Sequence, residues 1–187
     1  MNGGNLKDQM GDDKFFRDAL EQFGIVGPQI SEAEINAVLP QTFPGKEDLV
    51  QFYLRCNGGS RSPQGCIVHC GNPAHRISRH ELEKLNVEGF RSISPNADER
   101  MLPFANMLMH HATMAQIYAG VPAMKTFLEQ HMEIAFDHSG NDLCLNLQNG
   151  RIFFIDWESY AEGAVEITPS FHEFVLKFWN IPHAPDE

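Results

Sequence analysis

Apolar residues in the first third of the chain recur at the spacing of amphipathic helices. After a polar, glycine-rich flexible tail over residues 1–11, the pattern predicts a helix over residues 12–23. Ser31 and Glu34 have the spacing of a capping box, in which each side chain satisfies a backbone amide of the other residue, so a short second helix is predicted there. A third helix is predicted over residues 46–56, with a buried face formed by Leu49, Phe52, Tyr53 and Cys56.

The middle of the chain is rich in methionine and is mostly helical in its pattern. A short strand is predicted over residues 66–69, and a second capping-box spacing predicts a short helix over residues 79–85. Two further helices are predicted over residues 103–118 and 122–130, on either side of a Gly-Val-Pro break. Methionine suits either an irregular core or an adaptable contact surface, and the helical spacing favours the core for Met101, Met107, Met109 and Met114.

The strongest strand signal lies in the last third of the chain. Leucine alternates with other residues over 143–147, which predicts a strand with one buried face. Asn149 and Gly150 are the preferred pair for a two-residue type I′ turn. The apolar run over residues 152–155 is therefore predicted to return as an antiparallel strand that is buried on both faces.

Together these elements predict one α+β domain over residues 12–187. A further strand is predicted over residues 132–136, and a last helix over residues 169–178 follows Thr168 as its cap. Helices at the N-terminus, in the middle and at the C-terminus then surround a mostly antiparallel sheet of about four to six strands. No internal repeat and no linker divides the chain.

Four blocks of this sequence occur in an order that resembles a known family. The first is LPQTFPGKEDLVQFYLRCNGGS (residues 39–60), with a small helix, a proline break and a helix that ends in Asn-Gly-Gly. The others are MEIAFDHSGNDLCLNL (residues 132–147), GRIFFIDWES (residues 150–159) and ITPSFHEFVLKFW (residues 167–179). In the order and spacing of these blocks the chain resembles the SUKH superfamily, which includes Smi/Knr-type regulators of yeast cell-wall synthesis and bacterial toxin-immunity proteins.

The resemblance implies a SUKH-like domain that binds another protein, performs no catalysis and needs no cofactor. Bacterial members are cytoplasmic immunity proteins that neutralise a toxin from neighbouring cells, and the short chain fits this type. The expected partner is a toxin domain, and the expected state is a monomer or weak dimer. A regulatory scaffold of the Smi/Knr type is the alternative, followed by a small metal-dependent enzyme. Residues 86–130 are longer and more helical than the family's usual middle, so we expect a helical insertion there.

The charge of the chain favours a basic partner and argues against nucleic acid. Among its 187 residues are 14 Lys and Arg and 25 Asp and Glu, for a formal net charge of −11. A nucleic-acid-binding protein needs a positive surface for the phosphates. The acidic excess is concentrated in residues 129–187, where Arg151 and Lys177 are the only basic residues. Such asymmetry is a hint about association.

No sequence feature points to a membrane or to export. No apolar run approaches the roughly 20 residues that span a bilayer. The first residues, MNGGNLKDQMGDD, lack the apolar core of a secretory signal, so we expect a cytoplasmic protein whose four cysteines are reduced.

An acidic stretch with interleaved aromatic residues follows the strand predicted over residues 152–155. Acidic side chains steer a basic partner toward the surface, and aromatic side chains supply buried contact area. The alternative is a solvated loop whose tryptophan lies in the core. The candidate partner-binding residues are Asp156, Trp157, Glu158, Tyr160, Glu162 and Glu166.

The sequence signals for a metal site are weaker than those for the partner-binding residues. Four soft ligands lie within ten residues, but adjacent residues of a strand point to opposite sides, and the spacing is not that of a common zinc finger. Buried thiols and surface histidines are therefore favoured over zinc for Cys66, His69, Cys70 and His75. The acidic stretch over residues 137–142 lacks the bidentate glutamate of a calcium loop and is predicted to be a turn with positive φ at Gly140.

No motif of a known catalytic class is present, and no catalytic residue is predicted. His110 and His111 are adjacent in a predicted helix, where successive side chains diverge by about 100°. We therefore expect one of them to be packed and the other to be solvated.

Overall fold

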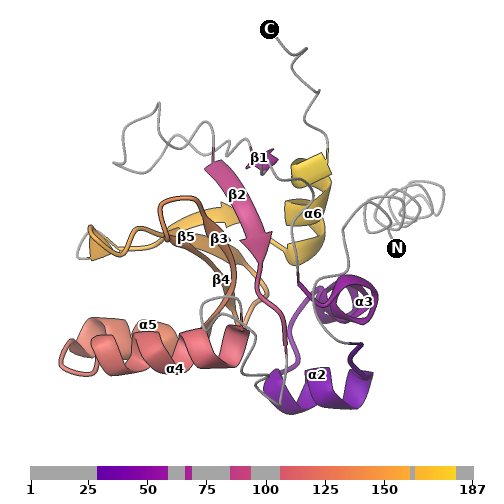
Figure 1. Cartoon of the computed structure of the whole chain (residues 1–187), viewed down its shortest axis with the longest axis horizontal. Helices are drawn as coiled ribbons and strands as arrows, with labels where there is room; N and C mark the ends of the chain where they lie inside the picture. The colour runs from indigo at the N-terminus through magenta and orange to yellow at the C-terminus, as the bar shows by residue number, and fades with distance from the viewer. Residues whose placement is uncertain (1–28, 59–65, 69–84, 94–105, 161–162, 180–187) are drawn as a thin grey trace, which may run out of the picture.

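The computed structural model describes the chain over residues 29–58, 66–68, 85–93, 106–160 and 163–179. Five helices and six strands lie within these residues, which confirms the predicted α+β class (Figure 1). The predictions for residues 1–11 and 12–23, and for the helix before Leu85, lie outside the described residues.

A six-stranded antiparallel sheet forms the middle layer of the described structure, and each strand pairs with the next one along the chain. The strands are β1 (Cys66–Val68), β2 (Leu85–Phe90), β3 (His131–Asp137), β4 (Asp142–Asn146), β5 (Ile152–Ile155) and β6 (Val165–Thr168). Strand β2 was not predicted. Residues 86–130 were expected to form a helical insertion, but this segment begins as a strand of the sheet.

The hairpin of β4 and β5 is confirmed, but its turn is not type I′. Leu143 pairs with Phe154, as expected for adjacent antiparallel strands. A type I′ turn requires positive φ at both central residues. Gly150 has a φ of 73°, but Asn149 is not among the described residues with positive φ. The loop is longer because the Asn146 side chain accepts hydrogen bonds from two loop amides, at 2.9 and 3.1 Å.

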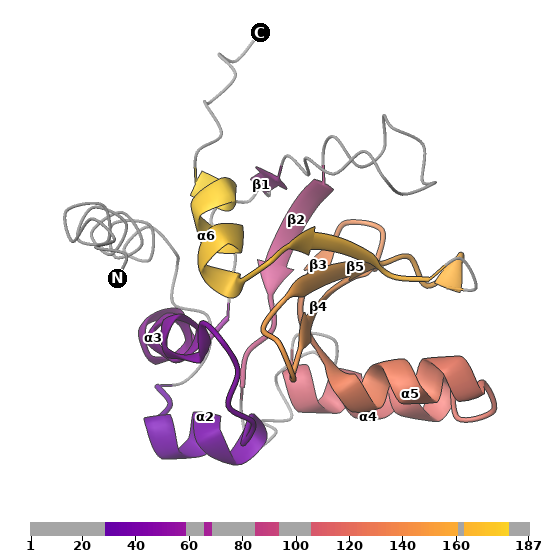
Figure 2. The same ribbon diagram turned by 180° about the vertical axis from the view of Figure 1, so that it is seen from behind.

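Three helices cover one face of the sheet (Figures 1 and 2). They are α2 (Glu32–Val38), α3 (Lys46–Cys56) and α6 (Phe171–Trp179). The main core lies between them and the sheet, and it includes the buried aromatic rings of Phe52, Phe90, Phe171 and Phe174. No helix in the described part of the chain has both the length and the apolar character needed to cross a bilayer.

The ends of these helices follow local sequence signals, with one exception. The capping box of Ser31 and Glu34 forms at the start of α2 as predicted. Thr168 is not the cap of α6, because it belongs to strand β6. Ser170 begins that helix instead, since its hydroxyl accepts a hydrogen bond from the Glu173 amide at 3.1 Å.

The helices α4 (Met107–Ile117) and α5 (Pro122–Gln130) cover the opposite face of the sheet (Figures 1 and 2). Helix α5 has the predicted bounds. Helix α4 begins at Met107 rather than at residue 103, because Asn106 has an extended backbone and caps the helix with its side chain. Met107 and Met114 are buried, as the core interpretation predicted, and Met109 is half-buried.

One face of the central strands carries apolar side chains and the other carries polar ones, and the candidate site lies on the polar face. Leu143 and Leu145 point into the main core, whereas Asp142, Cys144 and Asn146 belong to the face beneath α4 and α5. All five residues of β4 are buried, so the prediction of one buried face was wrong. A polar strand face usually meets water; here two helices cover it.

Candidate functional site

Two carboxyl groups and one guanidinium are buried beneath α4. Glu133 on β3 and Asp142 on β4 are both fully inaccessible to solvent, and Arg91, directly after β2, is 2% exposed. The Arg91 guanidinium donates from Nη1 to the carbonyl of Ala135 at 2.9 Å and lies over the ring of Phe136, 5.0 Å from its centroid. Burying charged groups is costly unless they are paired, so their partners define this site.

Asp142 joins three separate parts of the chain. Its Oδ1 lies 2.6 Å from Nη1 of Arg91. Its Oδ2 accepts a hydrogen bond from Nε2 of His110 at 2.7 Å and another from Nε1 of Trp157 at 2.9 Å. One carboxyl group therefore connects the strand layer, helix α4 and the loop after β5.

Glu133 is paired with the second histidine of α4. Nδ1 of His111 donates to Oε2 of Glu133 at 2.8 Å. The prediction of one packed and one solvated histidine was wrong, because His110 and His111 reach two different carboxyl groups on neighbouring strands. The hydrogen bond to Glu133 raises the pKa of His111, against the opposing effect of burial.

A third histidine on this face is held in its neutral form. His131 donates from Nδ1 to the carbonyl of Phe127 at 2.8 Å, and its Nε2 accepts from the amide of Asn146 at 3.0 Å. Its ring stacks on that of Phe127, with centroids 4.0 Å apart. Burial lowers the pKa of His131, so this residue anchors the end of α5 without a charge.

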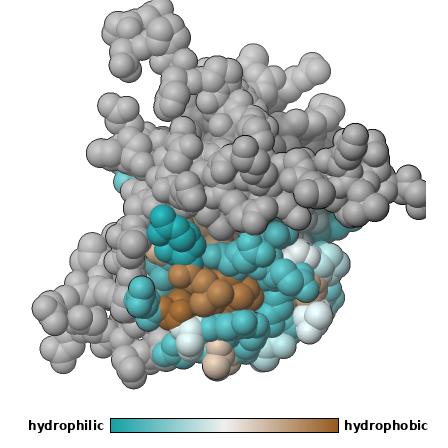
Figure 3. Space-filling model, turned by 90° about the vertical axis from the view of Figure 1, so that its right-hand side faces the viewer, coloured by the Kyte–Doolittle hydropathy of each residue, from teal (hydrophilic) through white to brown (hydrophobic). Residues whose placement is uncertain are grey.

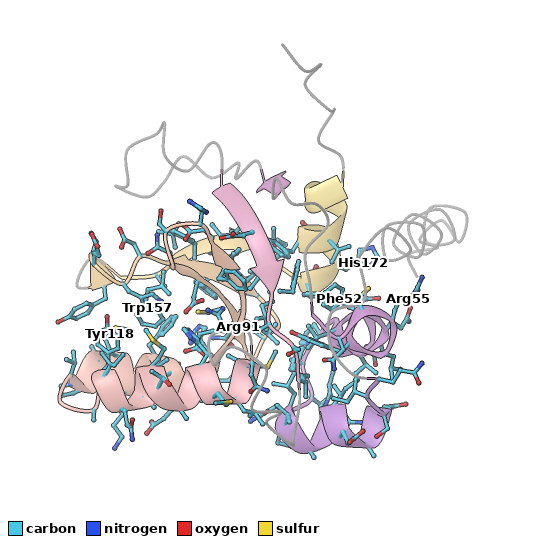
Figure 4. The ribbon with its side chains drawn as sticks, in the orientation of Figure 1. Phe52, Arg55, Arg91, Tyr118, Trp157 and His172 are labelled. Atoms are coloured by element: carbon cyan, nitrogen blue, oxygen red, sulfur yellow. The ribbon has the colours of Figure 1, made fainter. Side chains whose placement is uncertain are left out.

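Three aromatic rings join the end of α4 to the loop after β5. Tyr118 stacks on Trp157, with centroids 5.2 Å apart, and meets Tyr160 edge-on at 5.1 Å. The Tyr118 hydroxyl also donates to the carbonyl of Trp157 at 3.1 Å. Figure 4 shows Tyr118 and Trp157 close together above the α4–α5 pair, with Arg91 farther along the same layer. The methionine-rich segment and the acidic loop therefore form one continuous region.

The candidate partner-binding residues of the loop have different roles. Glu158 is exposed. Asp156 accepts hydrogen bonds from the backbone amides of Glu158 and Ser159 and so fixes the turn. Trp157 and Tyr160 are half-buried, each with part of its ring in the cluster with Tyr118.

Of the other two acidic candidates, one is paired within the protein and the other lies outside the described residues. Glu166 forms a salt bridge with Arg151 at 2.6 Å, which offsets its charge. Glu162 lies outside the described residues. Among the described candidates, Glu158 is therefore the acidic side chain that remains for an incoming partner.

The surface next to this loop is uncharged. Residues 106–124 contain no Asp, Glu, Lys or Arg, in a chain that is 21% charged. Ile117, in the last turn of α4, is 63% exposed, and the adjacent Tyr118 belongs to the ring cluster. Ile117 was not predicted as a surface residue, although the lack of Asp, Glu, Lys and Arg over this stretch is a visible signal.

A second apolar patch lies on the other side of the molecule. Leu54 on α3 is 45% exposed. Figure 3 shows apolar residues surrounded by hydrophilic ones on the side where α2 and α3 lie. The acidic and aromatic loop over residues 156–160 packs with the other cluster, beside α4 and α5, so this patch is a weaker candidate than the one at Ile117.

Three of the four weak candidates for zinc ligands fall outside the described part of the chain. His69, Cys70 and His75 lie outside the described residues, and Cys66 is described only as part of β1. Within the described residues there is no group of three or more metal-ligating side chains.

The buried thiols and carboxyl groups are suited to structure rather than to reaction. Burial raises the pKa of Cys56 to about 11, and it raises the pKa of Cys144 well above its ordinary value. Both thiols are therefore protonated near neutral pH, and a protonated thiol is a poor nucleophile. Glu133 and Asp142 are engaged by histidine and arginine side chains, so the arrangement holds elements together.

Comparison with known proteins gives one match. The model of the SMI1 / KNR4 family (SUKH-1) matches residues 29–177, which is most of the chain and nearly all of its described part. Comparisons with curated proteins and with solved structures found no match. The family match agrees with the resemblance of the four sequence blocks and with the α+β fold, and this chain therefore belongs to the SMI1/KNR4 (SUKH-1) family.

Proposed function

We propose that this protein is a cytoplasmic, non-catalytic immunity protein that neutralises a toxin domain by binding it through a basic surface of the toxin. The SMI1/KNR4 family is generally non-enzymatic, and its members interact with other proteins. The acidic character of the chain, with a formal net charge of −11, complements a basic partner.

The observation that carries this proposal is the stack of Tyr118 on Trp157. It places the exposed, uncharged end of α4 beside a loop with the exposed acidic residue Glu158. Aromatic anchors beside an apolar contact, with charge at the edge, are typical of protein-binding surfaces. The fitting partner presents an apolar side chain flanked by lysine or arginine.

The partner is found by testing the products of neighbouring genes. The full chain is immobilised, and each product is passed over it to measure association and dissociation rates. An immunity protein is expected to bind one such product with a 1:1 stoichiometry and to suppress its toxicity on co-expression. Binding to none of them, with capture of an unlinked host protein instead, would favour the alternative of a regulatory scaffold.

Reversal of the charge at Glu158 is expected to slow association with that partner. Long-range attraction steers the encounter and is screened by salt over about 8–10 Å. Glu158→Lys is therefore expected to lower the association rate constant by about threefold or more at low ionic strength. The same change at Glu173, an exposed residue on α6 on the opposite face of the sheet, is the matched control and is expected to have a smaller effect. Equal effects of the two variants would contradict a local acidic site.

Removal of the apolar side chain of Ile117 is expected to act on dissociation instead. Ile117→Ser takes away contact area without a change of charge, at a position that is 63% exposed and contributes little to the core. The dissociation rate constant is expected to rise by about fivefold, which corresponds to about 1 kcal/mol. Leu54→Ser on α3 is the matched control. A larger effect at Leu54 would move the binding surface to α3.

A further inference from the structure

The face of the sheet beneath α4 holds more negative than positive groups. Arg91 is one guanidinium beside two fully buried carboxyl groups, Glu133 and Asp142. Nη1 of Arg91 lies at Asp142, so Glu133 depends on another group. Among the described residues, Oε1 of Glu133 has no hydrogen-bond partner, and Oε2 is bonded to His111. A proton on His111 therefore balances the charge of this face.

The two histidines of helix α4 link it to the sheet through side-chain hydrogen bonds. Its inward face carries the buried Met107 and Met114, and between them lie the two histidines that bond to the strands. Apart from its two histidines, the helix has no acidic or basic residue. Its described attachments thus include the two methionines, the two histidine–carboxyl pairs and a hydrogen bond from the Met107 amide to the Ser92 carbonyl at 2.9 Å.

The same pairs reach the partner-binding loop. Oδ2 of Asp142 is bonded at once to His110 on α4 and to the indole of Trp157. At the other end of α4, Tyr118 stacks on the same indole. A movement of α4 away from the sheet therefore breaks the stack of Tyr118 on Trp157 and removes His110 from the carboxyl group that also binds the indole.

From this geometry we infer that the pairs His111–Glu133 and His110–Asp142 form a proton-dependent clamp, which holds α4 on the sheet and thereby positions Trp157. The clamp is tight when His111 carries a proton and loosens when that proton is lost. The assignment of Trp157 to a binding surface rests on the function proposed above; the clamp itself does not.

The sign of the pH dependence follows from the direction of the shift. The pKa of His111 in the folded protein is raised above its ordinary value of 6.5, first by the hydrogen bond to Glu133. The stabilising contribution is thus complete below the unfolded pKa and is lost as the pH rises through the folded pKa. The clamp is expected to loosen on the alkaline side of pH 6.5.

Three other titratable groups near α4, on β3, on β4 and at the end of the helix, have pKa values shifted away from this range. His131 on β3 has a lowered pKa and stays neutral above pH 6.5. The pKa of Cys144 on β4 is raised well above its ordinary value of 9.0 by burial, and that of Tyr118 is raised above its ordinary value of 10.0. On α5, Lys125 and Glu129 are exposed and paired with each other at 3.9 Å.

The test is amide hydrogen exchange of the full chain at pH 6.5 and pH 8.5, with rates corrected for the intrinsic effect of pH. Protection of residues 107–117 is expected to decrease as the pH rises from 6.5 to 8.5. The decrease approaches a limit of about tenfold for each unit by which the pKa of His111 in the folded protein exceeds that in the unfolded chain. Protection of α2, on the opposite face, is expected to stay constant, since its residues include no histidine. Protection of α4 that does not change with pH would overturn the clamp.

One variant, with a matched control, distinguishes the effect of the proton on His111 from the effect of its hydrogen bond to Glu133. In His111→Asn the side-chain amide can still donate to Glu133 but takes up no proton, so α4 is expected to stay docked and to lose its pH dependence. The matched control is His138→Asn, because His138 forms a similar pair with Glu88 at 3.4 Å but is 84% exposed. It is expected to behave like the unchanged protein. An unaltered pH dependence in His111→Asn would refute the clamp.

The indole N–H signal of Trp157 in proton NMR tests the link to the loop without any partner. It is assigned by its loss in Trp157→Phe and is expected to shift with the same midpoint as the exchange of α4. A stationary signal would overturn the link. Failure of partner binding would not affect this readout, so it distinguishes an error in the proposed function from an error in the clamp.

Discussion

Replacement of Asp142 by alanine is expected to lower the free energy of unfolding by about 3–5 kcal/mol, because it leaves a buried guanidinium unpaired. Arg91 is 2% exposed, and Asp142 lies 2.6 Å from it at 0% exposure. The change also removes the acceptor for His110 and Trp157. Urea unfolding followed by circular dichroism measures the loss.

The salt bridge between Arg151 and Glu166 provides a matched control. Its atoms are also 2.6 Å apart, but both side chains are in contact with solvent. Glu166→Ala is expected to cost less than about 1 kcal/mol, since exposed ion pairs contribute little. If both alanine variants lost the same stability, burial would not be the reason for the effect of Asp142. The double change Arg91→Met and Asp142→Leu, which removes both charges, is expected to recover much of the loss.

Replacement of Gly150 by alanine is expected to destabilise the protein by about 3 kcal/mol or more. Its φ of 73° is unfavourable for alanine, and a Cβ atom there would lie 2.2 Å from the carbonyl oxygen of Pro44 and 3.3 Å from the ring of Phe43. The contact with Pro44 is with the backbone, so it is relieved only if the hairpin and the segment before α3 move apart. Thermal unfolding measures the difference.

Gly140, in the β3–β4 turn, distinguishes the cost of positive φ from the cost of the close approach to Pro44. Its φ is 84°, but nothing lies within 4 Å of the position that a Cβ atom would take. Gly140→Ala therefore carries the backbone strain alone and is expected to cost about 1 kcal/mol. Similar losses for Gly140→Ala and Gly150→Ala would show that the close approach to Pro44 has no energetic weight.

Local signals predicted most elements of this fold, with strands β2 and β6 as the exceptions. The helices 46–56 and 122–130 have the predicted bounds, because a glycine or proline lies at an end of each and one face of each is apolar. Strand β2 was missed, since its sequence LNVEGF contains glycine and glutamate and no alternation that stands out. It pairs with β3, 41 residues farther along, and no local pattern reports such a partner.

The buried polar site could not be predicted from local sequence patterns, for a different reason. Glu133 and Asp142 alternate with apolar residues along their strands, a pattern typical of a face in water. Only the position of α4 shows that this face is covered. For His110 and His111, the angle between neighbours in a helix shows that the side chains diverge, but it does not reveal two carboxyl acceptors on adjacent strands. The candidate loop follows β5, as the sequence predicted, but no local pattern indicated its contact with Tyr118.

The order of the strands also has a consequence for the kinetics of folding. Strands β3 to β6 pair with their neighbours across short connections, so these contacts are local and form early. Strand β2 joins only after a chain segment that contains α4 and α5 has closed into a loop, which costs conformational entropy. Changes in the β4–β5 hairpin are then expected to slow folding, whereas changes at His111 mainly speed unfolding.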